Sequence, residues 1–326
     1  MRIAILGATS QIAKDLILSF AAHSRHELVL YARRPEAVVQ WLNHENLVPA
    51  YTVADFAAFT TQEHFDAILN FVGVGNPAQT AAMGASIFDV TLKYDELALG
   101  YVQRYPTCRY IFLSSGAAYG SSFEAPADVD TKATIDINHL QPQDWYGVAK
   151  LHAECRHRSL AHLAIVDIRV FNYFSHTQDI EARFLMTDIL RAVRDKTVLK
   201  TSAENIVRDF LHPSDFYQLV SVMLAAPSTN AAIDGYSRAP INKTTLLAVM
   251  QNRFNLRYEA CLESTGVNAT GSKRHYFSKN LRAAEFGYAP VWNSIDGICH
   301  EAELILNSSD APYPGMPATS RLPNLL

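Results

Sequence analysis

Short apolar runs that alternate with longer helical stretches are the feature that most restricts the fold of this chain. The runs read RIAILG, HELVLYA, AILNFVG, RYIFLSS and LAIVDIRVF, and they are rich in Val, Ile and Leu. Because they are apolar on successive residues rather than on alternate ones, they suit strands that are covered on both faces. The sequence therefore predicts an α/β fold of the Rossmann type, a doubly wound parallel sheet with crossover helices.

The alternation weakens after about residue 175, and this change predicts the domain organisation. We expect residues 1–174 to form a dinucleotide-binding domain. Residues 175–305 combine a helical segment, short strand-like runs and a Pro/Asn/Gly-rich piece, which predicts mainly a smaller C-terminal α/β substrate-binding lobe, interleaved with the first domain. Residues 306–326 are rich in proline and are expected to form an extended tail.

The charge balance restricts the partners of the protein. The chain has 28 basic and 32 acidic residues, a net charge of -4, so no basic surface suggests nucleic acid or anionic lipid. We expect a small-molecule partner. No apolar run reaches the roughly 18 residues of a membrane span, and the first residues, MRIAILGATS, enter a strand without a cationic leader. A cytoplasmic protein that does not cross a membrane is expected.

The four cysteines predict neither a disulfide framework nor a metal site. Cys108, Cys155, Cys261 and Cys299 lie far apart and form no Cys-x-x-Cys or Cys/His spacing. We interpret them as thiols in a reducing compartment.

The segment AILGATSQIA has the character of a dinucleotide-binding turn. Gly7 follows the first predicted strand, and Ser10 and Ala13 stand at the next two steps of three residues. Small residues there let the backbone turn tightly and approach a pyrophosphate, whose charge the helix N-terminus favours. Only the first position is glycine, so a strand-to-helix turn of an unrelated α/β protein is an open alternative. The cofactor contacts expected here are Gly7, Thr9, Ser10, Gln11 and Ile12.

Three later strand ends add to the expected cofactor site. Arg33 and Arg34 follow the second strand, where an acidic residue would bind the ribose diol of NAD, and guanidinium groups suit the 2′-phosphate of NADP instead. The sequence therefore favours NADP, with NAD possible; the alternative is that these arginines are solvated. Asp55 could meet the adenine. The run NFVGVG brings small residues close to the cofactor, with expected contacts from Phe71, Val72 and Gly73.

The segment DWYGVAK places Tyr146 and Lys150 on one face of a helix. A phenol has a pKa near ~10, and a neighbouring ammonium group with an oxidised nicotinamide would lower it toward neutrality, as proton transfer requires. Ser115 ends the strand RYIFLSS at the edge of the sheet where ligands bind, and its hydroxyl could hold the same substrate oxygen. A core tyrosine beside a surface lysine is the alternative.

Over residues 1–305 the chain resembles the extended short-chain dehydrogenase/reductase family of nucleotide-sugar epimerases, dehydratases and ketoreductases. The similar segments are GATSQIA, FLSSGAAYG, YGVAK, RVFNYFS, VRDFLHPSDF and NLRAAEFGYAP. The resemblance implies that Ser115 and Tyr146 act on a substrate oxygen and that Lys150, also a cofactor contact, binds the nicotinamide ribose. It also implies a nucleoside-diphosphate sugar as substrate and a homodimer formed through the YxxxK helix.

The resemblance further implies residues that bind the substrate. Asn172 and Arg208 match positions around the diphosphate, and a guanidinium group can bind a phosphate through paired hydrogen bonds; an ion pair of Arg208 with Asp209 is the alternative. Arg274 is a further diphosphate candidate whose spacing to the closing helix differs from that of the family. His176 could reach a sugar hydroxyl or be a solvated loop residue.

Departures from the family pattern narrow the reaction. The 4,6-dehydratases carry an Asp-Glu pair after the strand-end Ser/Thr, and here Gly116 and Ala117 stand there, so dehydration is not expected. Thr91 replaces a helix asparagine of many members. The main hypothesis is an NADPH-dependent reductase of a 4-keto sugar. A redox-neutral C4 epimerase with tightly bound NAD and a catalytically silent dinucleotide-binding regulator are the alternatives.

Overall fold

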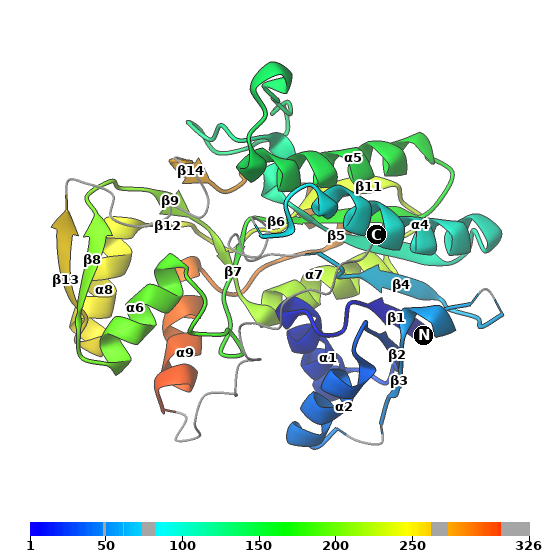
Figure 1. Cartoon of the computed structure of the whole chain (residues 1–326), viewed down its shortest axis with the longest axis horizontal. Helices are drawn as coiled ribbons and strands as arrows, with labels where there is room; N and C mark the ends of the chain where they lie inside the picture. Colours follow the sequence, from blue (N-terminus) through cyan, green and yellow to red (C-terminus); the bar gives the residue numbers. More distant parts are fainter. Residues whose placement is uncertain (48–49, 61, 74–81, 262–272, 308–326) are drawn as a thin grey trace.

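The computed structural model describes residues 1–47, 50–60, 62–73, 82–261 and 273–307. A seven-stranded sheet with the order β11-β6-β5-β4-β1-β2-β3 forms its centre, and every pairing in it is parallel (Figure 1). Its strands are β1 Arg2–Leu6, β2 Glu27–Tyr31, β3 Thr52–Ala54, β4 Ala67–Asn70, β5 Arg109–Ser115, β6 Ile165–Val170 and β11 Ala231–Asp234. This topology confirms the predicted doubly wound α/β fold.

Helices cover both faces of the large sheet, which explains the continuous apolar runs. Helices α1 (Gln11–His23), α2 (Pro35–His44) and α7 (Pro213–Ala225) pack on one face, and α4 (Ser86–Arg104) and α5 (Trp145–Ser159) pack on the other (Figure 1). Successive residues of β1 are buried in the two different cores. Strand β11 and helix α7 come from the segment after residue 175, so the C-terminal part of the chain completes the large sheet.

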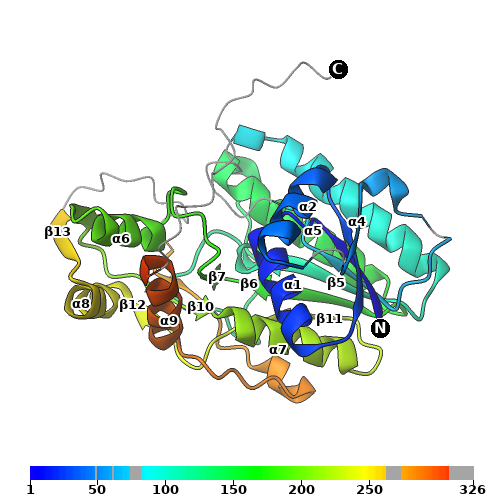
Figure 2. The ribbon, with the colours of Figure 1, turned by 90° about the horizontal axis from the view of Figure 1, so that it is seen from below.

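A smaller lobe with its own apolar core stands at one end of the large sheet (Figure 2). Its elements include α6 Leu185–Arg194, β8 Val198–Ser202, α8 Lys243–Phe254, β13 Arg257–Cys261 and α9 Ser294–Asn307. The predicted tail begins inside this last helix, and its residues 308–326 lie outside the described part of the chain. None of the helices in the described part has the length and apolar character that a membrane crossing requires.

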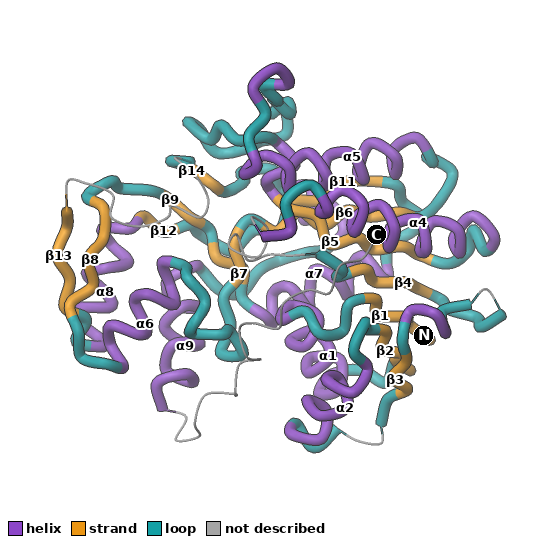
Figure 3. The backbone as a smooth tube through the Cα atoms, viewed as in Figure 1, coloured by secondary structure: helices purple, strands orange, loops and turns teal. Residues whose placement is uncertain are grey.

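Two very small sheets lie between the lobe and the large sheet (Figure 3). They consist of β7 Asn172–Tyr173, β9 Val207–Arg208, β10 Phe210–Leu211, β12 Ile241–Asn242 and β14 His275–Tyr276. The remaining short 3-10 turns are η1 Phe56–Ala58, η2 Gly116–Tyr119, η3 Ile137–His139, η4 Pro142–Asp144 and η5 Arg282–Phe286. The segment VRDFLH forms two short strands instead of one, because β9 pairs with β12 and β14 whereas β10 pairs with β7. Between them, the Asp209 carboxylate accepts hydrogen bonds from Ser237 and Ser294.

Candidate active site

The turn after β1 needs glycine at one position only. Gly7 has a φ of 84°, and a Cβ on it would lie 2.9 Å from the carbonyl carbon of Phe71 and from the amide nitrogen of Val72. Ser10, in contrast, has a φ of −64° at the N-cap of α1, a conformation that any residue adopts. The turn can therefore pack closely although Ser10 and Ala13 replace the second and third glycines of the motif. Its N-terminal helix amides lie at the carboxyl edge of the sheet, where phosphates bind.

The side chains around this turn differ in how far they are exposed. Thr9 is exposed, and the three residues after it are partly buried. The side-chain amide of Gln11 donates to Ser175 Oγ at 2.8 Å. Phe71 is buried, Val72 partly buried and Gly73 exposed. The rest of NFVGVG, from residue 74, lies outside the described residues.

The predicted adenosine-side residues lie near the ends of β2 and β3. Arg33 and Arg34 are both exposed, and they follow the strand whose last carbonyl, on Tyr31, accepts the amide N–H of Gly7 at 2.8 Å. They thus stand beside the candidate phosphate turn. Asp55 is exposed and caps the η1 turn by accepting the amide N–H of Ala58 at 3.0 Å.

The structure brings Ser115, Tyr146 and Lys150 together at the carboxyl end of β5. Lys150 Nζ lies 5.8 Å from the centroid of the Tyr146 ring and donates to the carbonyl oxygen of Leu113 at 2.7 Å. Burial raises the pKa of Tyr146, and a hydrogen bond with Ser115 partly offsets this effect. Burial lowers the pKa of Lys150 to about 8. The three groups can therefore act on one substrate oxygen as a proton donor or acceptor, a hydroxyl and a nearby cation.

Two glycines explain how α5 and the end of β5 approach so closely. A Cβ on Gly147 would lie 2.6 Å from the carbonyl oxygen of Ala117, so α5 can pack on η2 only without a side chain there. A Cβ on Gly116 would overlap the ring of Phe171. A side chain on the residue after Ser115 would therefore require the Phe171 ring to move.

Tyr276 is a site residue that the sequence did not reveal. Its phenol oxygen lies 3.2 Å from Ser115 Oγ, although the two residues are 161 positions apart. The side chain is 4% exposed, and burial raises its pKa. No local spacing links strand β14 to the YxxxK helix, so only the tertiary fold could identify this second phenol.

One buried and one partly buried cation extend the site into the lobe. Arg208 is 5% exposed and donates from Nη1 to the carbonyl oxygens of Val207 and Lys273, both at 2.8 Å. Burial lowers its pKa to about 10. The ammonium group of Lys273 lies 4.6 Å from the Tyr276 ring centroid, and burial, followed by repulsion from Arg208, lowers its pKa to about 8. The side chain of Arg274, the residue expected here, is exposed.

The other two predicted substrate residues hold structural hydrogen bonds. Asn172 donates from its side-chain amide to the carbonyl oxygens of Asp209 and Tyr276, at 3.1 and 3.3 Å, and so joins β7 to β14 and to the residue between β9 and β10. His176 bonds to Glu301 of α9, at 2.6 Å from its amide nitrogen and at 2.7 Å from Nδ1. The structure therefore bonds Asn172 to the backbone of Tyr276 and His176 to α9.

Two histidines lie close to the carboxylate of Glu301, and a hydrogen bond accounts for the contact of one of them with it. Donor atoms of His212, His300 and Glu301 all lie within 4.8 Å of one another. His212 Nδ1 accepts the amide N–H of Ser214 at 3.2 Å, which places the ring proton of a neutral imidazole on Nε2. That N–H donates to Glu301 Oε1 at 2.9 Å.

Comparisons with solved structures show the same fold. Among solved structures, UDP-glucose 4-epimerase from Thermotoga maritima with UDP-glucose has a TM-score of 0.76 at 14% identity, over 95% of this chain and 100% of that chain. UDP-glucuronic acid 4-epimerase from Bacillus cereus, in complex with UDP-glucuronic acid and NAD, has 0.72 at 15%, over 94% and 99%. The dTDP-glucose 4,6-dehydratase from Bacillus anthracis, in complex with NAD, has 0.72 at 13%, over 95% and 97%. Identities this low show a shared fold alone.

The sequence comparisons decide the family. A search of curated protein sequences found no match. The model of the NAD dependent epimerase/dehydratase family matches residues 3–236, a span that includes the Gly7 turn, the end of β5 and the YxxxK helix. This chain therefore belongs to the NAD dependent epimerase/dehydratase family.

Proposed function

We propose that the protein is an NAD-dependent 4-epimerase of a nucleoside-diphosphate sugar. The observation that carries this proposal is the joint position of Ser115, Tyr146 and Lys150 beside the Gly7 turn, with no carboxylate on the residues that follow Ser115. The 4,6-dehydratases use an Asp-Glu pair at these positions to expel water from the sugar, and the side chains of Gly116 and Ala117 can act neither as an acid nor as a base. The fold shared with two 4-epimerases, one of them in complex with NAD, favours a redox-neutral reaction over net reduction.

The residues around the turn fit a dinucleotide. Gly7 removes the Cβ that would separate the turn from the backbone of Phe71 and Val72, and this close approach leaves room for phosphates at the start of α1. A Cβ on Gly73 would lie 3.5 Å from Lys150 Nζ, so the ammonium group reaches the end of β4, where it would hold the nicotinamide ribose. When bound, NAD would accept a hydride from the sugar and return it to the opposite face.

The side chains of the site divide the remaining work. Tyr146 would take the proton of the sugar hydroxyl and later return it, while Ser115 holds the same oxygen. The hydrogen bond with Ser115 opposes the effect of burial on the pKa of Tyr146. Arg208, which is buried, and Lys273, which is partly buried, would bind the diphosphate, since two cations this close together are unfavourable without an anion.

A reductase that uses NADPH is the second candidate. Arg33 and Arg34 are exposed after β2, beside the phosphate turn, and guanidinium groups at that position suit a 2′-phosphate. In that case the enzyme would release its cofactor after each turnover, and Tyr146 would supply a proton to a keto sugar.

The experiment that separates the two candidates identifies the nucleotide that co-purifies with the protein. The purified protein is denatured, the released nucleotide is identified, and UDP-glucose and UDP-glucuronic acid are incubated with fresh protein and followed by NMR. Bound NAD near one per chain, and a C4 epimer formed without net oxidation or reduction, would support the proposal. An empty protein that prefers NADPH over NADH and consumes it with 4-keto sugar nucleotides would replace it with the reductase.

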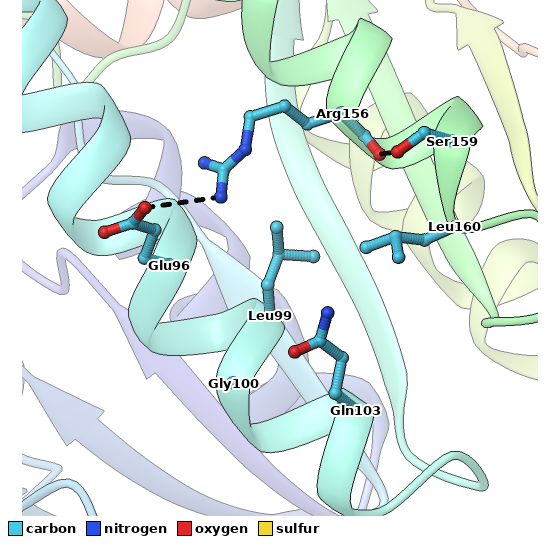
Figure 4. Close-up of a pocket in the computed structure, with 7 residues that line it drawn as sticks. All are labelled: Glu96, Leu99, Gly100, Gln103, Arg156, Ser159 and Leu160. Carbon is cyan, nitrogen blue, oxygen red and sulfur yellow. Dashed lines mark hydrogen bonds and ion pairs between the residues drawn. The ribbon is translucent and has the colours of Figure 1, made fainter.

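We also propose that the protein forms a homodimer through α4 and α5. A hollow between these helices is lined by Glu96, Leu99, Gly100, Gln103, Arg156, Ser159 and Leu160 (Figure 4). No atom outside the α4 backbone lies within 4 Å of the position that a Cβ on Gly100 would take, so a helix of a second copy could approach closely there. Light scattering should give a dimer for the wild type and a monomer for Gly100→Trp. A wild-type monomer would contradict the proposal.

A further inference from the structure

The hydroxyl of Ser115 has three polar neighbours. Its oxygen accepts the amide N–H of Ala117 at 3.2 Å, lies 3.2 Å from the phenol oxygen of Tyr276 and shares a hydrogen bond with Tyr146. A serine hydroxyl has one hydrogen to donate and two lone pairs to accept with. One lone pair serves Ala117, so the serine can donate to one phenol only and must accept from the other.

Tyr276 is the phenol that donates to Ser115. Its O–H group is buried and therefore needs an acceptor, and among the described residues Ser115 Oγ is the hydrogen-bond partner of this phenol oxygen. Burial raises the pKa of Tyr276, so this phenol keeps its proton. A separation of 3.2 Å is long for two hydroxyl groups, but hydrogen bonds at reactive centres are commonly long before the substrate binds.

The packing around Tyr276 holds the phenol in place. Its ring lies edge-on to Phe123, at 4.8 Å between centroids, and 5.2 Å from the ring of Phe171. Its carbonyl oxygen accepts the side-chain amide of Asn172 at 3.3 Å. Strand β14 also pairs in parallel with β9, where Tyr276 faces Arg208 in the register. These contacts fix the position of the Tyr276 phenol relative to Ser115.

We infer that Tyr276 is a positioning residue that donates its hydrogen to Ser115 and thereby turns the serine hydrogen toward Tyr146 and the substrate oxygen. This inference rests on the proposed function, in which Ser115 and Tyr146 share that oxygen. The two phenols then have separate roles: Tyr146 exchanges its proton with the sugar, and Tyr276 keeps its own. With Tyr276 donating to it, the serine directs its single hydrogen to the Tyr146 phenolate instead of sharing it between the two phenols.

The first test measures the titration of Tyr146 directly and needs no turnover. The protein is labelled with tyrosine carrying ¹³C at Cζ, and the Tyr146 signal is identified by its loss in Tyr146→Phe. In Tyr276→Phe the titration midpoint of Tyr146 should rise by about 0.5–1 pH unit, the effect of one net hydrogen bond to the phenolate. An unchanged midpoint would overturn the inference, whatever the substrate of the enzyme proves to be.

The second test asks whether Tyr276 acts through Ser115. Turnover is measured for the wild type, Tyr276→Phe, Ser115→Ala and the double variant. We expect Tyr276→Phe to lower kcat about five- to tenfold in the wild-type background and to have no further effect beside Ser115→Ala. Equal losses in both backgrounds would refute the positioning role and assign Tyr276 an independent one.

A matched control removes a buried phenol oxygen elsewhere. Tyr288 donates to the carbonyl oxygen of Tyr236 at 2.6 Å, inside the core, and Tyr288→Phe should leave both the midpoint and kcat unchanged. Should Tyr276→Phe not fold, the titration midpoint of Tyr146 is measured in Ser115→Ala, which tests whether Ser115 stabilises the Tyr146 phenolate. This midpoint must rise by at least the same amount, and a midpoint equal to that of the wild type would overturn the inference.

Discussion

The buried imidazole of His157 predicts a pH dependence of stability that can be worked out from its partners. The ring belongs to α5 and is fully buried, with Nδ1 at 2.5 Å from Asp167 Oδ1 and Nε2 at 2.7 Å from Asp95 Oδ1. Burial alone would lower its pKa, but the two carboxylates outweigh burial and raise the pKa to about 9. The imidazolium therefore ties the helix of the YxxxK motif to β6 and α4.

The sign of the effect follows from the two protonation equilibria. The pKa of a histidine is about 6.5 in the unfolded chain and about 9 in the folded one, so folding favours the protonated ring. The stabilisation is fully present below pH 6.5 and is lost as the pH rises through 9. A difference of about 2.5 pH units corresponds to about 3 kcal/mol. Lys150 acts in the opposite direction between about pH 8 and 10.5, because burial lowers its pKa.

The assay is urea unfolding of the wild type and of His157→Gln between pH 6 and pH 10 at constant ionic strength. The contribution of Lys150 is common to both proteins and cancels in the difference. The wild type should be the more stable protein at pH 6, and its advantage in free energy of unfolding should shrink by about 3 kcal/mol by pH 10. A difference that does not change with pH would refute the reasoning, because it would mean that folding does not favour the protonated ring.

Three further substitutions test the candidate site. Tyr146→Phe should remove most turnover and leave cofactor affinity near that of the wild type in a fluorescence titration; more than half of the activity retained would rule out proton transfer by this phenol. Arg33→Ala should weaken NADP binding about tenfold and NAD binding little, since only the 2′-phosphate needs the guanidinium; an equal effect on both cofactors would make Arg33 irrelevant to their discrimination. Lys273→Met should raise KM for the sugar nucleotide about tenfold with kcat nearly unchanged, as expected for a diphosphate contact; a fall in kcat alone would move Lys273 to another role.

The sequence predicted what is encoded locally and missed what the tertiary fold assembles. The runs around Ile3 and Ile5 identified the parallel sheet because each residue of such a strand is buried on one face or the other. The Gly7 turn and the Ser115 strand end could be found because each lies directly after a strand, within a short motif. The Tyr276 phenol could not, because the strand β14 that carries it reaches the site through tertiary contacts such as its pairing with β9.

The buried charges around His157 could not be predicted from the sequence either. His157 sits four residues after Ala153 on the inner side of α5, and nothing in its neighbourhood distinguishes it from a solvated histidine of the last helical turn. Its partners Asp95 and Asp167 lie 62 and 10 residues away and come from α4 and β6. Only the packing of those elements turns three ordinary polar residues into a buried charged cluster.

The overlap between a side chain at position 116 and the ring of Phe171 has an evolutionary consequence. A carboxylate at the first of these positions and an aromatic ring at the second cannot occupy the same space. Lineages that acquire the acid must therefore also shrink the ring, or move the strand end that carries it, and the two positions should vary together among relatives of this chain. This pair offers a marker for sorting uncharacterised members into dehydrating and non-dehydrating groups before any activity is measured.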